Sequence, residues 1–313
     1  MIIVLVVVIF FLSSASALEP VVPGSSEKQE FVINIGQGFK EIAAALQQQG
    51  LIKSAWWFKI YSLLVGRAQQ FKPGHYQLSP ALSSVELVEI LMRGPEDVTV
   101  IIQEGGTLVD IDHQLSQLGI IKAGELIEFN RLRQLAGEKS LEGFLFPDTY
   151  KLAAASPISR VVTKFLDNFQ EKAGEIKYQD LILASLLEKE AAHPQDRLLA
   201  SGILTKRLQL GMLLQVDAAN VYIKCQGAYL TCPDEQRQLT RADLKSDSPY
   251  NTYRLKGLPP TPIANPGKEA IVAALNPQSS KYFYYISNPQ TGRLIFSQDL
   301  DEHNGNRYKY LIR

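Results

Sequence analysis

One leucine-rich stretch, residues 181–214, constrains the fold of this chain most strongly, because it begins with a segment whose pattern predicts a helix with an apolar face. At about 100° of rotation per residue, residues 181–192 place four apolar side chains on one arc of that helix. The arc consists of Ile182, Leu183, Leu186 and Leu187. Glu190 follows at helical spacing and lies near the middle of this arc, whereas Glu188 falls on another side. One carboxyl group is therefore predicted to face leucine side chains.

The predicted surroundings of Glu190 suit acid–base chemistry. A carboxyl group in apolar surroundings keeps its proton to higher pH, because desolvation disfavours the charged form. A general acid that works near neutral pH needs this property. The alternative is a structural glutamate at the rim of the core, or one paired with an arginine such as Arg207, since ion pairs also perturb pKa values. The helical spacing leaves both interpretations open.

The composition excludes several classes of function. The 313 residues have room for about two domains, and a charged fraction of 20% is that of an ordinary globular protein. The formal net charge is zero, which gives no electrostatic reason to expect nucleic acid as a partner. The four histidines are scattered, and the chain has no zinc-ligand spacing, phosphate-binding glycine loop or serine-hydrolase motif. We therefore expect no nucleic acid, no metal and no cofactor.

The first 18 residues predict a membrane or export segment. Residues 1–12 are apolar without interruption, and residues 13–18 extend the segment to a helical length of about 27 Å, just short of a bilayer core of about 30 Å. Two interpretations stay open: a transmembrane signal anchor, and a signal peptide cleaved at the Ala15-Ser16-Ala17 motif. Both place the rest of the chain outside the cytoplasm. Residues 19–30 contain Pro, Gly and Ser and are predicted to be a linker.

Residues 31–95 are predicted to form a small domain of the order strand, helix, helix, strand. The strands are predicted at 31–35 and 74–78, the helices between them at 39–49 and 55–65, and a further helix at 84–92. Ser54 and Ser83 are at positions that favour helix caps. This βααβ pattern resembles a LysM-like module, a type that binds GlcNAc-containing glycans. Small units of this shape serve many functions, so the pattern alone does not decide the ligand.

Residues 96–313 are predicted to form a larger mixed domain, which makes the fold class α+β. A strand is expected at 98–103, helices at 108–118, 125–135, 157–172 and 196–210, and a hairpin within 282–296. We expect Asp196 to cap the helix that follows Glu190. Residues 141–150 and the proline-rich residues 248–267 must be shaped loops, because proline excludes regular helices and central strands. Such loops carry sites or act as stiff connectors, and both interpretations stay open.

The only two cysteines, Cys225 and Cys232, lie in a polar segment of the larger domain. Outside the cytoplasm a pair at this spacing favours a disulfide that pins a loop over two free thiols.

Several motifs now agree with one family. These are ASLLEKEA (184–191), KRLQLGMLLQVD (206–217), YNTYRLKGLPPTPIANPG (250–267), LEGFLFPDTY (141–150) and FSQDLDEHN (296–304). In this order and spacing the chain resembles the endolytic murein transglycosylases, the MltG/YceG-like family, from about Phe31 to its end. Family members usually have Gln-Thr-Asp-Pro where this chain has Gln215-Val216-Asp217-Ala218, and the segment with the two cysteines looks private to this chain.

The resemblance implies an enzyme held by a single span in the bacterial cytoplasmic membrane, with a LysM-like subdomain and a catalytic domain on the extracytoplasmic side. It implies that peptidoglycan glycan strands are the substrate, that the enzyme cleaves nascent strands internally, and that it is linked to cell-wall synthases. The family's catalytic glutamate is the second acid of Glu-Lys-Glu, which corresponds to Glu190. The helical spacing indicates the same residue independently.

The expected reaction breaks the β-1,4 bond between MurNAc and GlcNAc without water. Glu190 protonates the leaving oxygen and then accepts the proton of the MurNAc C6 hydroxyl, which closes a 1,6-anhydro ring. Four residues are expected to line the groove and hold the sugar: Gln215, Asp217, Asn251 and Tyr253. The alternative is that these four residues only join the proline-rich loop to the rest of the domain.

Two other functions remain as alternatives. A lysozyme-type hydrolase would need a second carboxylate besides Glu190, for which Asp217 and Asp148 are the candidates. A non-catalytic glycan-binding protein would use the LysM-like unit, and Glu190 would then be structural.

Overall fold

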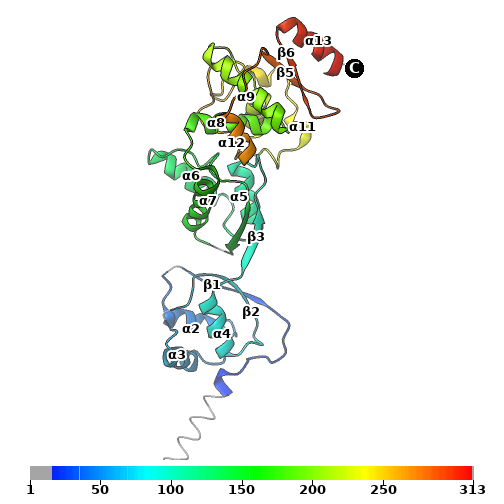
Figure 1. The fold of residues 1–313 in the computed structure, drawn as a ribbon. Helices are drawn as coiled ribbons and strands as arrows, with labels where there is room; N and C mark the ends of the chain where they lie inside the picture. Colours follow the sequence, from blue (N-terminus) through cyan, green and yellow to red (C-terminus); the bar gives the residue numbers. More distant parts are fainter. Residues whose placement is uncertain (1–15, 35, 69, 155, 312–313) are drawn as a thin grey trace, which may run out of the picture. The chain divides into compact units, whose positions relative to one another are not determined.

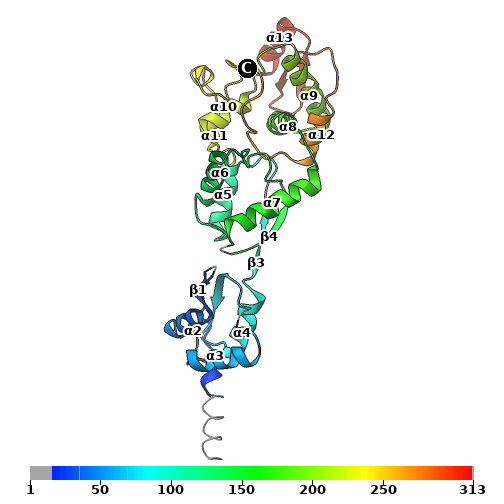
Figure 2. The same cartoon turned by 90° about the vertical axis from the view of Figure 1, so that its left-hand side faces the viewer.

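The computed structural model describes residues 16–34, 36–68, 70–154 and 156–311. Its fold is α+β, as predicted, with helices and three two-stranded sheets in the described residues. The chain divides into two compact units (Figures 1 and 2). The N-terminal unit runs to Thr99 and includes residues 118–120 and 151–156; the larger unit contains residues 100–117, 121–150 and 157–313.

The N-terminal unit has the predicted strand, helix, helix, strand order. Its elements are β1 (Gln29–Ile33), α2 (Phe39–Gln48), α3 (Ala55–Leu64), β2 (Gly74–Leu78) and α4 (Ser84–Arg93). β1 and β2 are antiparallel, with Phe31 opposite Tyr76. Both predicted caps are present, since Ser54 accepts a hydrogen bond from the Trp57 amide and Ser83 forms a capping box with Glu86. The side chains between the sheet and the helices form a core of their own, which includes Phe31, Leu46 and Phe58.

The larger unit is mainly helical. Its helices are α5 (Leu108–Gln117), α6 (Glu125–Leu135), α7 (Ile158–Ala173), α8 (Tyr178–Glu190), α9 (Pro194–Gln209), α10 (Asp217–Lys224), α11 (Asp234–Arg237), the 3-10 helix η1 (Asp243–Lys245), α12 (Lys268–Leu275) and α13 (Leu300–Leu311). β5 (Tyr284–Ser287) and β6 (Leu294–Ser297) form the predicted hairpin. β3 (Asp97–Ile101) pairs with β4 (Thr149–Ala153), and three residues of each of these strands belong to the N-terminal unit.

Helix α8 is at the centre of the larger unit's core. Every side chain from Leu181 to Leu187 is buried, and all but Ser185 are apolar, so the middle of the helix is buried around its whole circumference rather than along the single predicted arc. A helix of this kind requires neighbours on all sides. α9 and α12 pack against α8 and against each other (Figure 1). The first residues of the helix, Tyr178–Asp180, and its last turn, from Glu188 onward, are more exposed.

The prediction that Asp196 caps the helix after Glu190 is wrong. α9 begins at Pro194, which is tolerated in a first turn because its missing N–H would have no partner there. Asp196 is instead 3% exposed, and its carboxylate accepts hydrogen bonds from Arg293 Nη2 and the Leu294 amide, both at 2.9 Å. It therefore fastens the β5–β6 hairpin to α9.

The predicted anchor, residues 1–18, lies mostly outside the described residues. Within the described part of the chain, no helix combines the length and apolarity needed to cross a bilayer.

Candidate active site

Glu190 is the last residue of α8. The chain turns extended at Ala191, and His193 and Pro194 then start α9. The Glu190 side chain is partly buried, and its Oε1 accepts a long hydrogen bond of 3.5 Å from the Ala218 amide. That amide belongs to the first turn of α10, where backbone N–H groups have no partner inside the helix. The Tyr285 hydroxyl, from β5, forms a second hydrogen bond to Glu190.

The surroundings of Glu190 raise its pKa to about 7. Burial contributes most, because the charged form loses water, and the neighbouring Asp217 carboxylate adds like-charge repulsion. The hydrogen bonds from Tyr285 and Ala218 and the charge of Arg207 act in the opposite direction. Near neutral pH the group is therefore present in both protonated and ionised forms, which a combined acid and base requires.

Arg207 is buried near Glu190 but forms no ion pair with it. Its guanidinium group donates to the carbonyl oxygens of Phe283 at 2.9 Å and Leu214 at 2.7 Å, and it covers the Tyr284 ring. Within the described residues, no cation comes within ion-pair distance of the Glu190 carboxylate. The structural alternative in which Arg207 pairs with Glu190 is therefore not what the structure shows.

The first glutamate of the Glu-Lys-Glu sequence has a different environment. Glu188 forms an ion pair of 3.3 Å with Arg197, and both side chains are almost fully buried, at 7% and 5% exposure. The other carboxylate oxygen accepts from the Gly267 amide at 2.8 Å. Arg197 also donates to the Ala191 carbonyl at 2.9 Å. Glu188 thus holds α8, the start of α9 and the proline-rich segment together, and both of its oxygens are occupied.

Asp217 and Tyr253 lie together beside this helix end. The Tyr253 hydroxyl donates to Asp217 Oδ1 at 2.5 Å, and Asp217 is exposed. The main chain just before Asp217 is fixed by Thr252, whose carbonyl accepts from the Gln215 amide at 3.1 Å and whose hydroxyl accepts from the Val216 amide at 2.9 Å. The structure therefore brings Glu190, Asp217 and Tyr253 into one neighbourhood, although they come from three separate segments.

Gln215 has an exposed side chain and a left-handed backbone, with φ of 54°. A non-glycine residue in this conformation is uncommon and strained, and such strain is concentrated at functional sites. Thr252 maintains this conformation by accepting hydrogen bonds from the Gln215 and Val216 amides. Sequence reasoning selected Gln215 but gave no sign of Thr252 as the residue that holds it.

The contacts of Asn251 favour the alternative structural role. The side chain is 0% exposed, and its Nδ2 donates to the carbonyl oxygens of Leu244 at 3.1 Å and Ser246 at 2.7 Å. Its Oδ1 accepts from the Tyr253 amide at 3.0 Å. Both polar atoms of the Asn251 side chain therefore form hydrogen bonds within the loop. Asn251 thereby positions Tyr253, while its expected contact with substrate stays a prediction.

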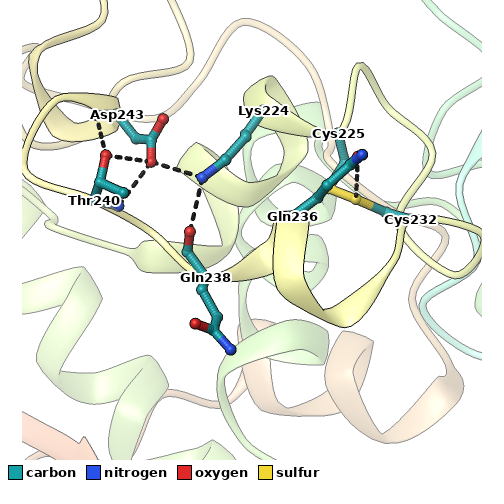
Figure 3. Close-up of polar contacts among 7 residues, drawn as sticks. All are labelled: Lys224, Cys225, Cys232, Gln236, Gln238, Thr240 and Asp243. Atoms are coloured by element: carbon teal, nitrogen blue, oxygen red, sulfur yellow. Dashed lines mark hydrogen bonds and ion pairs between the residues drawn. A yellow bond between two sulfur atoms is a disulfide. The ribbon is translucent and has the colours of Figure 1, made fainter.

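The segment with the two cysteines also reaches this neighbourhood. Cys225 and Cys232 form a disulfide, as predicted (Figure 3). The enclosed loop is fastened by Asp110, which accepts from the amides of Leu230 at 2.9 Å and Thr231 at 3.0 Å. The Tyr229 ring, in the same loop, lies 3.6 Å from the Lys189 ammonium group. Lys189 is the residue before Glu190, so the loop covers one side of the helix end.

Two tyrosines near Glu190 were not selected from the sequence. Tyr285 appeared only as part of a predicted strand, and Tyr229 only as part of a disulfide loop. Strand alternation and cysteine spacing carry no information on which distant carboxyl group a phenol will meet. Within the described residues, no group of three or more His, Cys, Asp or Glu side chains is arranged to hold a metal ion.

A model of the YceG-like family matches residues 31–309, and the chain therefore belongs to the YceG-like family. A protein of Bacillus subtilis (strain 168) named endolytic murein transglycosylase is 28% identical over 333 residues, which cover 96% of this chain and 90% of that protein. A protein of the same name from Streptococcus pneumoniae serotype 2 (strain D39 / NCTC 7466) is 26% identical, with 92% of this chain covered.

The chain spans 60% of the length of that pneumococcal relative. Among solved structures, the crystal structure of a YceG-like protein from Listeria monocytogenes is similar, with a TM-score of 0.55 and 28% identity. The alignment covers 90% of this chain and 100% of that one. The similarity therefore extends to the fold.

Proposed function

We propose that this chain is an endolytic peptidoglycan lytic transglycosylase, which cleaves the MurNAc-β-1,4-GlcNAc bond of glycan strands and leaves 1,6-anhydroMurNAc ends. One observation carries the proposal: the Glu190 carboxyl has a pKa of about 7 and no ion-pair partner among the described residues. The names of two relatives that match almost the whole chain support the same activity.

In the proposed reaction one carboxyl group acts twice. Protonated Glu190 donates to the GlcNAc O4 while the bond from that oxygen to MurNAc C1 breaks. The resulting carboxylate accepts the proton of the MurNAc C6 hydroxyl, and the C6 oxygen forms the new bond to C1. Atoms and protons balance without water, and Glu190 ends in its starting state. The nucleophile belongs to the substrate, so no second catalytic carboxylate is needed.

Asp217 and Tyr253 are proposed to bind the sugar at this site. Asp217 is exposed, and the Tyr253 hydroxyl holds one of its two oxygens, so the second oxygen is available to a sugar hydroxyl. The Asp217 charge also keeps Glu190 protonated to higher pH. Gln215, whose exposed side chain projects from the strained segment, is proposed to bind the sugar as well.

Asp217 also supports a second candidate function, a lysozyme-type hydrolase. Its carboxylate is close enough to Glu190 to raise the pKa of Glu190, and most glycoside hydrolases use a pair of carboxyl groups in catalysis. In that reaction water would attack C1, and the product would have a reducing end. The two functions therefore differ in one chemical feature of the product.

Mass spectrometry of the products decides between these functions. The full chain in detergent is incubated with uncrosslinked glycan strands, beside Glu190→Gln and the matched control Glu175→Gln, an exposed glutamate in the same unit. Anhydro ends from wild type and the control, absent with Glu190→Gln, are the expected result. Products with reducing ends would establish the hydrolase. The same products in the same amounts from all three proteins would show that Glu190 is not catalytic.

We also propose that residues 1–18 attach the chain to the cytoplasmic membrane, with both units on the extracytoplasmic side. The uninterrupted apolar sequence of residues 1–12 and the disulfide support this location, since disulfides persist outside the cytoplasm. Glycan binding by the N-terminal unit, action on nascent strands beside the synthases, and termination of strand growth are proposed from the family resemblance. Extraction of membranes with alkaline carbonate tests the attachment, and release of the chain into the soluble fraction would contradict it.

A further inference from the structure

Helix α3 of the N-terminal unit presents apolar side chains on two opposite faces. One face is in the core, where Phe58 and Ser62 are both 0% exposed. The opposite face consists of Trp56, Leu63 and Leu64, which are 52%, 63% and 81% exposed. At about 100° per residue these three side chains lie within one third of the helix circumference. A surface helix of a soluble domain is normally polar on this side.

The apolar face is bordered by cations. Lys53 precedes the helix, Lys59 lies within it, and Arg67 follows it, while residues 51–70 contain no acidic residue. Lys53 and Arg67 are exposed. Glu19 lies 3.8 Å from the Lys53 ammonium group and offsets part of its charge. An apolar centre with a basic border is the pattern of helices that lie in the headgroup region of an anionic bilayer.

The beginning of the described chain lies at the same helix. The Lys53 ammonium group donates to the Ser16 carbonyl oxygen at 3.1 Å, and Lys53 is two residues before α3 begins. Figures 1 and 2 both show the first blue residues beside α3. Ser16 follows directly on the apolar sequence of residues 1–12 and its short extension. The point where the chain would leave a membrane is therefore next to the apolar face.

We propose that the exposed face of α3, formed by Trp56, Leu63 and Leu64, docks on the surface of the bilayer to which the N-terminal segment attaches the chain. The inference rests on the proposed membrane attachment. Tryptophan is enriched at membrane–water interfaces because its ring is amphipathic, and leucine enters the acyl boundary below it. Lys59 and Arg67 reach the anionic headgroups. The N-terminal unit is then held against the membrane by two contacts rather than one.

Trp56 and Trp57 are the only tryptophans in the chain, so their fluorescence reports on this helix alone. The full chain carrying Trp57→Phe is reconstituted in vesicles of phosphatidylcholine and phosphatidylglycerol, with and without bromine on the lipid acyl chains. We expect blue-shifted Trp56 emission, most of which is lost to quenching in the brominated vesicles. Adding Leu63→Glu and Leu64→Glu should abolish both effects.

Leu132→Glu with Leu135→Glu is the matched control, since these leucines of α6 are also exposed, at 52% and 71%. This pair should leave the quenching unchanged, and the α3 pair should leave cleavage of soluble strands unchanged, which shows that it folds. Emission that is insensitive to brominated lipid would overturn the proposal. A blue shift that depends on protein concentration in plain micelles would assign the face to a second copy of the chain and also overturn it.

Vesicle flotation separates the possible failures. A chain that floats without quenching retains its attachment and loses only the docking of α3. A chain that does not float contradicts both the attachment and the docking. Fluorescence does not require activity, so quenching without anhydro products would contradict the proposed enzyme and leave the docking intact.

Discussion

Two glutamates in the larger unit, the buried Glu142 and the partly buried Glu190, have similarly raised pKa values but different hydrogen-bond surroundings. Burial raises the pKa of Glu142 to about 8 and that of Glu190 to about 7. Glu142 is 2% exposed, and its oxygens accept from the Leu108 amide at 3.0 and 3.2 Å, from Asn265 Nδ2 at 3.0 Å and from the Tyr222 hydroxyl at 3.3 Å. Glu190 has one long bond from a backbone amide and one from a tyrosine.

The donors around Glu142 come from the first residue of α5, from α10 and from the proline-rich segment. Asn265 of the proline-rich segment accepts from the amides of Gly143 at 2.8 Å and Leu145 at 2.9 Å, and its own main chain pairs with Gly105 and Gly106. Asn265 therefore gives the later part of the proline-rich segment a structural role, because it joins that segment to the loop of residues 141–150. Both carboxyl groups have a raised pKa, but Glu142 accepts hydrogen bonds from three surrounding groups, whereas Glu190 has fewer donors, as the proposed proton exchange with a substrate requires.

The largest expected effect comes from Glu190→Gln. The amide cannot donate and accept a proton as the carboxyl does, so the rate of anhydro product formation should fall by about 10²–10⁴-fold at pH 7. The midpoint of thermal unfolding should not fall. The rate is measured with full-length protein on soluble strands, with Glu175→Gln as the control. A rate within tenfold of wild type would contradict the proposed catalytic role of Glu190.

Glu142→Ala should damage the fold instead of the chemistry. It leaves the Leu108 amide, Asn265 Nδ2 and the Tyr222 hydroxyl without their acceptor in a buried site, and it opens a cavity. We expect a loss of about 3 kcal/mol in the free energy of unfolding, measured by urea denaturation. Activity per folded molecule, measured well below the unfolding transition, should stay close to that of wild type. Loss of activity in fully folded protein would contradict the assignment of Glu142 as structural.

Removal of the disulfide should have a smaller effect. Cys225 and Cys232 are separated by 7 residues, and a loop of this length contributes about 2 kcal/mol in the chain-entropy model. Cys225→Ser with Cys232→Ser should lower the free energy of unfolding by about this amount. The Asp110 hydrogen bonds to Leu230 and Thr231 should hold the loop partly in place, so activity should fall less than with Glu190→Gln. An unchanged urea midpoint would show that the loop needs no covalent link.

The raised pKa of Glu190 should also appear in the pH dependence of stability. Its folded pKa of about 7 lies above the ordinary value of 4.5, so the folded state binds the extra proton between these two pH values. Stability from this group is fully present below pH 4.5 and is lost as pH rises through 7. Glu190→Gln removes that loss and should be more stable than wild type above pH 7, on the order of 2 kcal/mol. Urea midpoints at pH 4.5 and pH 8 test this; a variant that gains nothing at pH 8 contradicts the prediction.

The smallest effect is expected from Asp217→Asn. Removing the Asp217 charge removes a like-charge repulsion, so the pKa of Glu190 should fall and the alkaline limb of the rate profile should move to lower pH, by less than about one pH unit. Tyr253→Phe is the matched control, because it breaks the hydrogen bond to Asp217 but keeps the charge. The control should not move the limb toward lower pH. If both variants move it equally, the hydrogen bond rather than the charge sets the pKa.

Local patterns in the sequence determined the strand, helix, helix, strand order near the N-terminus and the helix that ends at Glu190, and they led to the prediction of Glu190 as the catalytic acid. Helical spacing and caps such as Ser54 and Ser83 depend on residues a few positions apart, so they can be predicted from the chain alone. The disulfide was predicted for the same reason, since its cysteines are close in sequence.

Only the tertiary structure decided which polar groups form hydrogen bonds and ion pairs with each other. Glu188 and Glu190 are two residues apart in the sequence. Glu188 forms an ion pair with Arg197 and accepts a hydrogen bond from the Gly267 amide, whereas Glu190 has no ion-pair partner among the described residues and accepts from the main chain only a long hydrogen bond. Asn251 bonds within its own loop, and Tyr285 reaches Glu190 from a hairpin almost a hundred residues away. Such pairings depend on how the packed core aligns distant segments, and no periodicity in the sequence records that alignment.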